Sequence, residues 1–160
     1  MPTEEQRSAG GVLYRWSPTS GDEGTLEICL IATRASTRWQ LPKGHVGAGE
    51  TEAEGAAREV REETGCNSHV EEDLGEIVFW FFASDLKGRR RIRKRVHFFL
   101  ARYLDGETRD HDGEVDDAAW FDAEVARQRL TFDSERQILE KAVALLRRKR
   151  ADASTRSEAV

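Results

Sequence analysis

Three glutamates in the middle of the chain have the spacing of a ligand set for a hard metal ion. Glu59, Glu62 and Glu63 stand at positions i, i+3 and i+4, so on a helix their carboxylates share one face. Clustered carboxylate oxygens are the ligands that Mg²⁺ prefers in proteins. The alternative interpretation is a solvated, charged helix face, which is the ordinary role of paired glutamates.

Local signals predict the helix that would carry these carboxylates. Thr51 followed by Glu54 has the spacing of a capping box, so a helix should begin one residue after Thr51. Gly65 supplies a left-handed stop. Glu62 and Glu63 then fall in the last turn, where the helix dipole disfavours negative charge. Such a local conflict is expected where function determines the sequence, which favours the metal interpretation.

The longer pattern around the glutamates resembles a family signature. The segment from Gly44 to Cys66 reads GHVGAGETEAEGAAREVREETGC, or G-x5-E-x7-R-E-U-x-E-E-x-G-U with U an apolar residue. This pattern is similar to the signature of the Nudix (MutT-like) hydrolases, and the likeness extends over about residues 8–146. It implies an α/β/α sandwich around a central mixed β-sheet. It also implies hydrolysis of a pyrophosphate bond in a nucleoside diphosphate-linked substrate, with Mg²⁺ or Mn²⁺ as cofactor.

The resemblance also assigns expected roles to single residues. The same three glutamates would be metal ligands, joined by the backbone carbonyl of Lys43. Arg58 would orient an acidic residue of the site, and Glu50 would give structural support. Glu59 is the first candidate for the general base. Glu114 is the second, because relatives often place an additional acid on such a loop; it could equally be one charge of the acidic segment DHDGEVDD.

The substrate is suggested by the segment Trp39 to Glu50, WQLPKGHVGAGE. It resembles Nudix members that act on dinucleoside polyphosphates such as diadenosine tetraphosphate. Lys43 would bind a phosphate, and His45 would either assist near the metals or cap a turn. Trp39 would stack on a base or belong to the core, and the same two interpretations apply to Trp80 and Phe82.

Other activities stay open at this stage. They are hydrolysis of (deoxy)nucleoside triphosphates for nucleotide-pool sanitation, action on diphosphoinositol polyphosphates or RNA 5′ ends, and a non-enzymatic nucleotide or RNA sensor. Sensor domains usually lose signature acids, and this chain retains all of them. We expect a nucleotide polyphosphate substrate, a monomer or homodimer, no membrane partner and no stable nucleic-acid complex.

A basic segment, KGRRRIRKR from Lys87 to Arg95, stands out in a chain with a net charge of −5. Seven of its nine residues are basic. It could be a solvated hairpin whose arginines keep an edge strand from pairing with other chains. It could instead be an electropositive rim that attracts polyphosphate or an RNA 5′ end, in which case Arg95 is a candidate substrate contact.

Length and composition favour one highly charged globular domain. The chain has 160 residues, 38% of them apolar and 34% charged. We expect one domain over residues 1–150 and a disordered tail over 151–160. No apolar run reaches the ~20 residues that cross a membrane, and the N-terminal segment does not read as a signal peptide. Cys29 and Cys66 have no disulfide or zinc spacing, which favours a reducing cytoplasm.

Apolar periodicity predicts an α/β order of elements. Beyond the signature helix, the expected strands are 9–16 and 26–33, joined by the polar turn SPTSGDEG, then 39–41, 75–83, 93–103 and 118–121. The strands 75–83 and 93–103 should form a hairpin across SDLKGRR. A small helix is expected around 123–128, and a C-terminal helix from Phe132 with its apolar positions on one face.

Overall fold

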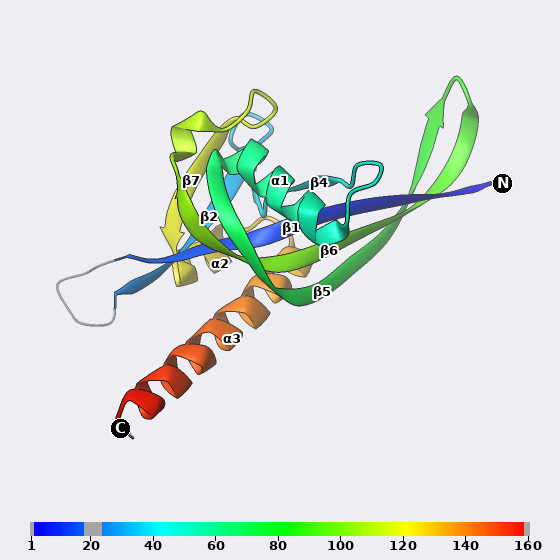
Figure 1. Ribbon diagram of the computed structural model, residues 1–160. Coiled ribbons are helices and arrows are strands. Elements are labelled where there is room, and N and C mark those ends of the chain that lie inside the picture. The colour runs from blue at the N-terminus through cyan, green and yellow to red at the C-terminus, as the bar shows by residue number, and fades with distance from the viewer. Residues whose placement is uncertain (1, 18–23, 159–160) are drawn as a thin grey trace.

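The structure is a computed structural model that describes residues 2–17 and 24–158. In chain order, its elements are β1 (Thr3–Ser17), β2 (Thr25–Thr33), β3 (Arg38–Gln40), β4 (Lys43–His45), α1 (Glu52–Thr64), β5 (Cys66–Asp85), β6 (Gly88–Gly106), the 3-10 turn η1 (Thr108–Asp110), β7 (Asp117–Asp122), α2 (Ala123–Arg129) and α3 (Asp133–Glu158). Figure 1 shows these elements in one body from which α3 and a long hairpin project.

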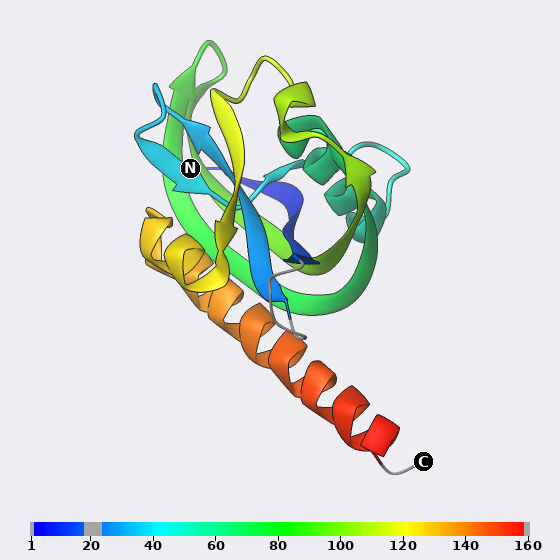
Figure 2. The ribbon, with the colours of Figure 1, turned by 90° about the vertical axis from the view of Figure 1, so that its left-hand side faces the viewer.

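The strands form one open, mixed sheet in the order β3-β2-β1-β6-β5, with β4 paired to β1 and β7 paired to β2. The central strands β1 and β6 run parallel, whereas the other strand pairs are antiparallel. Helix α1 lies on one side of this sheet and α3 on the other, as Figures 1 and 2 show together. The predicted fold class, helices around a central mixed sheet, is therefore confirmed.

Alternation along β1 divides the core into two layers. Val12 and Tyr14 point to the side of α3, where they belong to a cluster that includes Leu139. Leu13, between them in the chain, points to the side of α1 and packs in a second cluster with Val60. Successive strand residues face opposite sides of a sheet, so an apolar run in a central strand holds a helix on each face.

Several elements are longer than the sequence predicted. β1 begins at Thr3 instead of Ala9, because its first residues pair in parallel with β6. β5 begins directly after α1, at Cys66, where the sequence is polar and carries no strand signal. The short strand β4 was not predicted at all. The turn between β1 and β2 was predicted at 17–24, and its residues 18–23 lie outside the described part of the chain.

The C-terminal helix also extends further than predicted. Helix α3 continues to Glu158, so residues 151–158, which we expected to be a disordered tail, are helical in the structure. Residues 159–160 lie outside the described residues.

The predicted hairpin between β5 and β6 is confirmed, with Asp85 opposite Gly88 at its tip. We call residues 76–97 the hairpin arm. Figure 1 shows its tip reaching past the rest of the sheet, with the start of β1 running along it. The basic segment Lys87 to Arg95 lies on this arm, on the strand that is flanked by β1 and β5.

Candidate active site

The helix that carries the signature glutamates begins and ends as its sequence predicts. The side chain of Thr51 accepts a hydrogen bond from the backbone N–H of Glu54 at 3.1 Å. At the other end, Gly65 has a φ of 78°, a left-handed conformation that costs glycine little. Between these two residues α1 is regular, and this places Glu59, Glu62 and Glu63 on adjacent turns.

Arg58 is the centre of the hydrogen-bond network at this helix. Its guanidinium holds Glu50 in a bidentate pair, with distances of 2.8 and 3.0 Å. It also donates to Glu59 at 2.9 Å and to Glu62 at 3.1 Å. A further bond, of 2.8 Å, reaches the backbone carbonyl of His45. Arg58 therefore ties the loop before α1 to two of the three signature carboxylates.

Glu50 completes the loop at the start of the site. Besides Arg58, it accepts a hydrogen bond from the backbone N–H of Gly47 at 2.8 Å. The bonds from Arg58 and Gly47 stabilise the carboxylate form and lower the pKa of Glu50 to about 2. Its place in the structure is that of a support for the loop, which is the role that the family resemblance implies.

Gly44 leaves the space that the carboxylate of Glu59 occupies. A Cβ atom at Gly44 would lie 2.2 Å from Cδ of Glu59, much closer than non-bonded atoms allow. Burial raises the pKa of Glu59; the hydrogen bonds and charge of Arg58 oppose this, and the charges of Glu62 and Glu114 add to it. The close fit explains why the signature needs a glycine at this position of β4.

Glu63 is the most enclosed of the three carboxylates and is bound by a backbone group. The N–H of Lys43 donates to its Oε1 at 2.7 Å. Burial raises the pKa of Glu63 to about 7, although this hydrogen bond favours the charged form; the charge of Glu59 raises the pKa further. Several neighbouring acids that disfavour one another's charge form an environment in which a bound cation would stabilise the charged carboxylates.

The donor chemistry of this face suits a divalent cation. Three carboxylates lie along one edge of α1, and the glycine beside Glu59 keeps side chains away from it. The carboxylates are not converged on one point, however: within the described residues, no three acidic, histidine or cysteine side chains already form a metal-sized cluster. Glu59 and Glu62 are bound to Arg58 instead, and Glu63 to Lys43.

The structure brings Glu114 near this face but leaves its side chain exposed. Its charge contributes to the raised pKa of Glu59, so the loop between η1 and β7 lies close enough to act on that carboxylate. His45 is also exposed, and its backbone carbonyl accepts a hydrogen bond from Arg58. Both residues border the glutamate face and stay predictions as functional groups.

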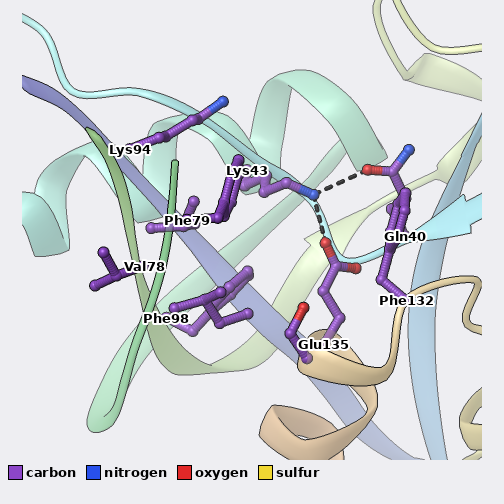
Figure 3. A pocket seen from close by; sticks show the side chains of 11 residues that line it. Gln40, Lys43, Val78, Phe79, Lys94, Phe98, Phe132 and Glu135 are labelled. Atoms are coloured by element: carbon purple, nitrogen blue, oxygen red, sulfur yellow. Dashed lines mark hydrogen bonds and ion pairs between the residues drawn. The ribbon is translucent and has the colours of Figure 1, made fainter. Parts of the chain in front are cut away.

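A cavity of about 500 Å³ lies on the side of the sheet covered by α3, and Lys43 links its lining to the glutamate face. This volume is within the range of small-molecule sites. Its lining combines apolar and aromatic side chains with a few polar groups: Ile77, Val78, Phe79, Val96, Phe98 and Phe132, with Gln40, Lys43, Lys94, Ser134 and Glu135. Figure 3 shows the Lys43 side chain between Gln40 and Glu135. One residue, Lys43, therefore contacts both the cavity and Glu63.

Glu135 is a residue of this cavity that sequence reasoning missed. It is 4% exposed, accepts a hydrogen bond from the backbone N–H of Leu41 at 2.8 Å, and forms an ion pair with Nζ of Lys43. It therefore fixes the loop that leads to β4. A signal existed in the sequence, since Glu135 falls on the apolar stripe of α3 with Ile138 and Leu139, where a carboxylate needs a partner.

Of the basic segment Lys87 to Arg95, the residue that lines the cavity is Lys94 and not Arg95. Adjacent residues of a strand face opposite sides of the sheet, so Lys94 lines the cavity while Arg95 pairs with Glu76 at 3.3 Å on the other face. Burial and the nearby charge of Lys43 lower the pKa of Lys94. Lys94 thus adds a positive charge to a cavity in which Lys43 is already paired with Glu135, which favours an anionic ligand.

Trp39 does not line this cavity. Its ring packs edge-on against Phe121, with the ring centroids 5.0 Å apart, and it contacts the core cluster on the side of α3. Trp39 is partly buried against this cluster, and its role as a base-stacking residue stays a prediction.

One loop joins the carboxylates of α1, the arginine that binds them and the neighbouring cavity. Comparison with known proteins agrees with this arrangement. The profile described as "NUDIX domain" matches residues 16–142. The chain belongs to the Nudix family. No helix within the described residues is both long enough and apolar enough to cross a membrane.

Three relatives illustrate the similarity. The chain is 37% identical to the putative mutator protein MutT4 of Mycobacterium tuberculosis, over 95% of this chain and 60% of that protein. It is 32% identical to an 8-oxo-(d)GTP phosphatase of Mycolicibacterium smegmatis, over 86% of this chain and 41% of that one. The chain thus spans less than two thirds of both proteins. The crystal structure of C. elegans Ap4A hydrolase superposes with a TM-score of 0.61 at 26% identity, covering 88% of this chain and 98% of that one.

Proposed function

We propose that this Nudix domain hydrolyses a pyrophosphate bond of a dinucleoside polyphosphate, such as diadenosine tetraphosphate, with Mg²⁺ or Mn²⁺. The observation that carries the proposal is the position of Lys43. Its side chain lies in the cavity with Lys94, and its backbone N–H holds Glu63. A nucleoside in the cavity would therefore direct its phosphates toward the signature carboxylates.

The residues divide the work by their chemistry. Phe79, Phe98 and Phe132 offer apolar and aromatic surface for a base or ribose. The ammonium groups of Lys43 and Lys94 bind phosphate oxygens by charge-assisted hydrogen bonds. A divalent cation held by the signature glutamates supplies charge screening and an activated water.

Proton transfer is assigned to the glutamate face. Glu59 is our proposed general base, because its carboxylate lies against Gly44, the residue of β4 that follows Lys43. Glu114 is the alternative base, from the loop that borders the site. Arg58 holds the loop and the carboxylates in place, and acts as a positioning residue.

A second candidate substrate is supported by the sequence comparisons. The relatives at 37% and 32% identity are named as a mutator protein and an 8-oxo-(d)GTP phosphatase. A cavity for one nucleoside suits a (deoxy)nucleoside triphosphate as well as half of a dinucleotide. The dinucleotide is favoured because the segment Trp39 to Glu50 resembles enzymes of that class, and because the Ap4A hydrolase is matched over 98% of its length.

Product analysis separates the two substrates. The protein is incubated with Mg²⁺ and diadenosine tetraphosphate, and in parallel with the four dNTPs and 8-oxo-dGTP. We expect ATP plus AMP from the dinucleotide, with the triphosphates nearly untouched. Release of a monophosphate and pyrophosphate from 8-oxo-dGTP, with the dinucleotide intact, would move the assignment to nucleotide sanitation. No product from any of them, in Mg²⁺ or Mn²⁺, would contradict both candidates.

A further inference from the structure

The hairpin arm exposes an unusual amount of aromatic surface. Trp80 and Phe82 are 51% and 55% exposed, and both point to the face of the arm opposite the cavity residue Phe79, because they alternate with it along β5. Soluble proteins seldom leave large rings of this kind on a projecting element unless they meet a ligand or partner.

Arginines of β6 are stacked on the same rings. The guanidinium carbon of Arg91 lies 4.4 Å from the centroid of Trp80, and that of Arg89 lies 4.7 Å from the centroid of Phe82. The register explains why each arginine stacks on a ring of the same face, since Phe82 lies opposite Arg91 on the paired strand. We call Trp80, Phe82, Arg89 and Arg91 the arginine–aromatic ladder.

The arginines of the ladder differ in their ion pairing from the other arginines of β6. Arg90, Arg93 and Arg95 of the same strand each form ion pairs with carboxylates. Within the described residues, Arg89 and Arg91 form no ion pair, and both are exposed. The arm as a whole, residues 76–97, has seven basic and two acidic side chains in a chain of net charge −5. Its positive charge is therefore concentrated where the rings are exposed.

We propose that the arginine–aromatic ladder is a binding surface for single-stranded nucleic acid. Bases stack on exposed aromatic rings, while phosphates bind the outer N–H groups of stacked guanidinium planes. Trp80 and Phe82 lie two positions apart on β5, or about 6.8 Å, so each ring can take a separate base. In a duplex the base faces are stacked inside the helix, so a duplex would bind only through the charges of the arginines.

A second copy of this chain is a poorer occupant of the surface. Pairing two arms would bring the unneutralised charges of Arg89 and Arg91 close to the same charges of the other arm, and like charges at an interface oppose association. A polyanion has the complementary charge. The surface does not depend on the glutamate face, so this proposal stands or falls separately from the proposed hydrolysis. It also departs from the sequence expectation of no stable nucleic-acid complex.

The test is fluorescence anisotropy in EDTA, where hydrolysis is absent. Labelled oligo(U) and oligo(dT) of about 12 nucleotides, within the span of known single-strand sites, are titrated with the intact chain at about 50 mM salt. We expect both to bind, and a duplex of equal length to bind more weakly. Trp80→Ala should weaken binding of the single strands about tenfold or more, and Trp80→Phe should restore most of it.

The arginines are tested by salt dependence. The double variant Arg89→Gln/Arg91→Gln should lower the slope of log K against log salt by about 1.4, because each phosphate contact on a single strand contributes about 0.7. Arg148→Gln, an exposed arginine of α3, is the matched control and should change neither affinity nor slope. Unchanged binding by Trp80→Ala, or equal binding of duplex and single strand, would overturn the proposal. Absence of binding to either single strand would also overturn the proposal. If light scattering then shows self-association that Trp80→Ala abolishes, the ladder binds a second copy of the chain, which likewise contradicts the proposal.

Discussion

The backbone N–H of Lys43 donates to Oε1 of Glu63 at 2.7 Å. This bond joins the short strand β4 to the carboxylate face of α1, while the side chain of Lys43 lies in the neighbouring cavity. We therefore expect recognition of a substrate and the chemistry of the glutamates to be coupled at Lys43. Changes on either side of this bond should alter catalysis more than they alter the fold.

Gly44→Ala should abolish most activity and leave the fold intact. The new Cβ would lie 2.2 Å from the Glu59 carboxyl group, and the end of a flexible side chain can move away at small cost. Glu59 would then leave its position, and we expect kcat to fall about 100-fold or more because catalysis depends on placement. Thermal denaturation and steady-state kinetics measure the two effects. Gly113→Ala is the control, since its Cβ would meet no atom within 4 Å.

Arg58→Lys should impair activity although it keeps the positive charge. Lysine cannot form the bidentate bond to Glu50 together with the bonds to Glu59 and Glu62. We expect a loss of about 10- to 100-fold in activity or Mn²⁺ affinity, as for residues that orient metal ligands. Arg61→Lys, exposed on the same helix, should be silent. Equal behaviour of the two variants in an Mn²⁺ titration would show that Arg58 does not organise the site.

Lys94→Gln should raise KM, whereas Arg95→Gln should not. Lys94 lines the cavity, while Arg95 is paired with Glu76 on the opposite face of the sheet. Losing a charged hydrogen bond to phosphate corresponds to about a 10- to 100-fold weaker interaction. Initial rates over a range of substrate concentrations measure this. A larger increase in KM for Arg95→Gln than for Lys94→Gln would contradict the register that turns Lys94 toward the cavity.

His97 predicts a pH dependence of stability. Its ring lies between the carboxylates of Glu52 and Asp73, with Nε2 at 2.8 Å from Asp73. Burial disfavours the charged ring, but the two carboxylates outweigh burial and raise the His97 pKa above 6.5. Hydrogen bonds from His97 lower the pKa of both Glu52 and Asp73, and Arg7 adds to the effect on Glu52.

The sign follows from these directions. The stabilisation by His97 is complete below pH 6.5, the ordinary value, and is lost as the pH rises through the higher folded-state pKa. Glu52 and Asp73 contribute stabilisation at pH values above their ordinary pKa values of 4.5 and 3.8. This stabilisation is lost as the pH falls through their lower folded-state pKa values. Urea denaturation should thus show a decrease of about 1 kcal/mol in the free energy of unfolding on the alkaline side. His97→Gln should remove this decrease, and exposed His69→Gln should preserve it; a curve for His97→Gln that matches the wild type would refute the assignment.

The sequence predicts best what depends on neighbouring residues. The limits of α1 follow from Thr51 and Gly65, because capping is local. The cavity was not predicted, because it requires the register that turns Lys94 inward and the packing of α3 that brings Glu135 to Lys43 across the molecule. The three-residue strand β4 is stabilised by pairing with β1 and has no signal of its own.

The hairpin arm shows the same limit of prediction from the sequence. Its basic residues were evident in the sequence, but which of them are neutralised was not. Arg90 finds Glu4 and Asp85 through the pairing of three strands, whereas Arg91 stacks on Trp80. Only the register between strands distinguishes a paired arginine from an available one.

We propose above all that the carboxylates of α1 hold the divalent cation on which hydrolysis depends. The most direct test of this proposal is Mg²⁺-dependent turnover of diadenosine tetraphosphate by the wild type, Glu63→Gln and Glu54→Gln, an exposed control on the same helix. We predict activity that EDTA abolishes in the wild type and in Glu54→Gln, and a loss of about 100-fold or more in Glu63→Gln with unchanged thermal stability. Full Mg²⁺-dependent turnover by a folded Glu63→Gln would contradict the account.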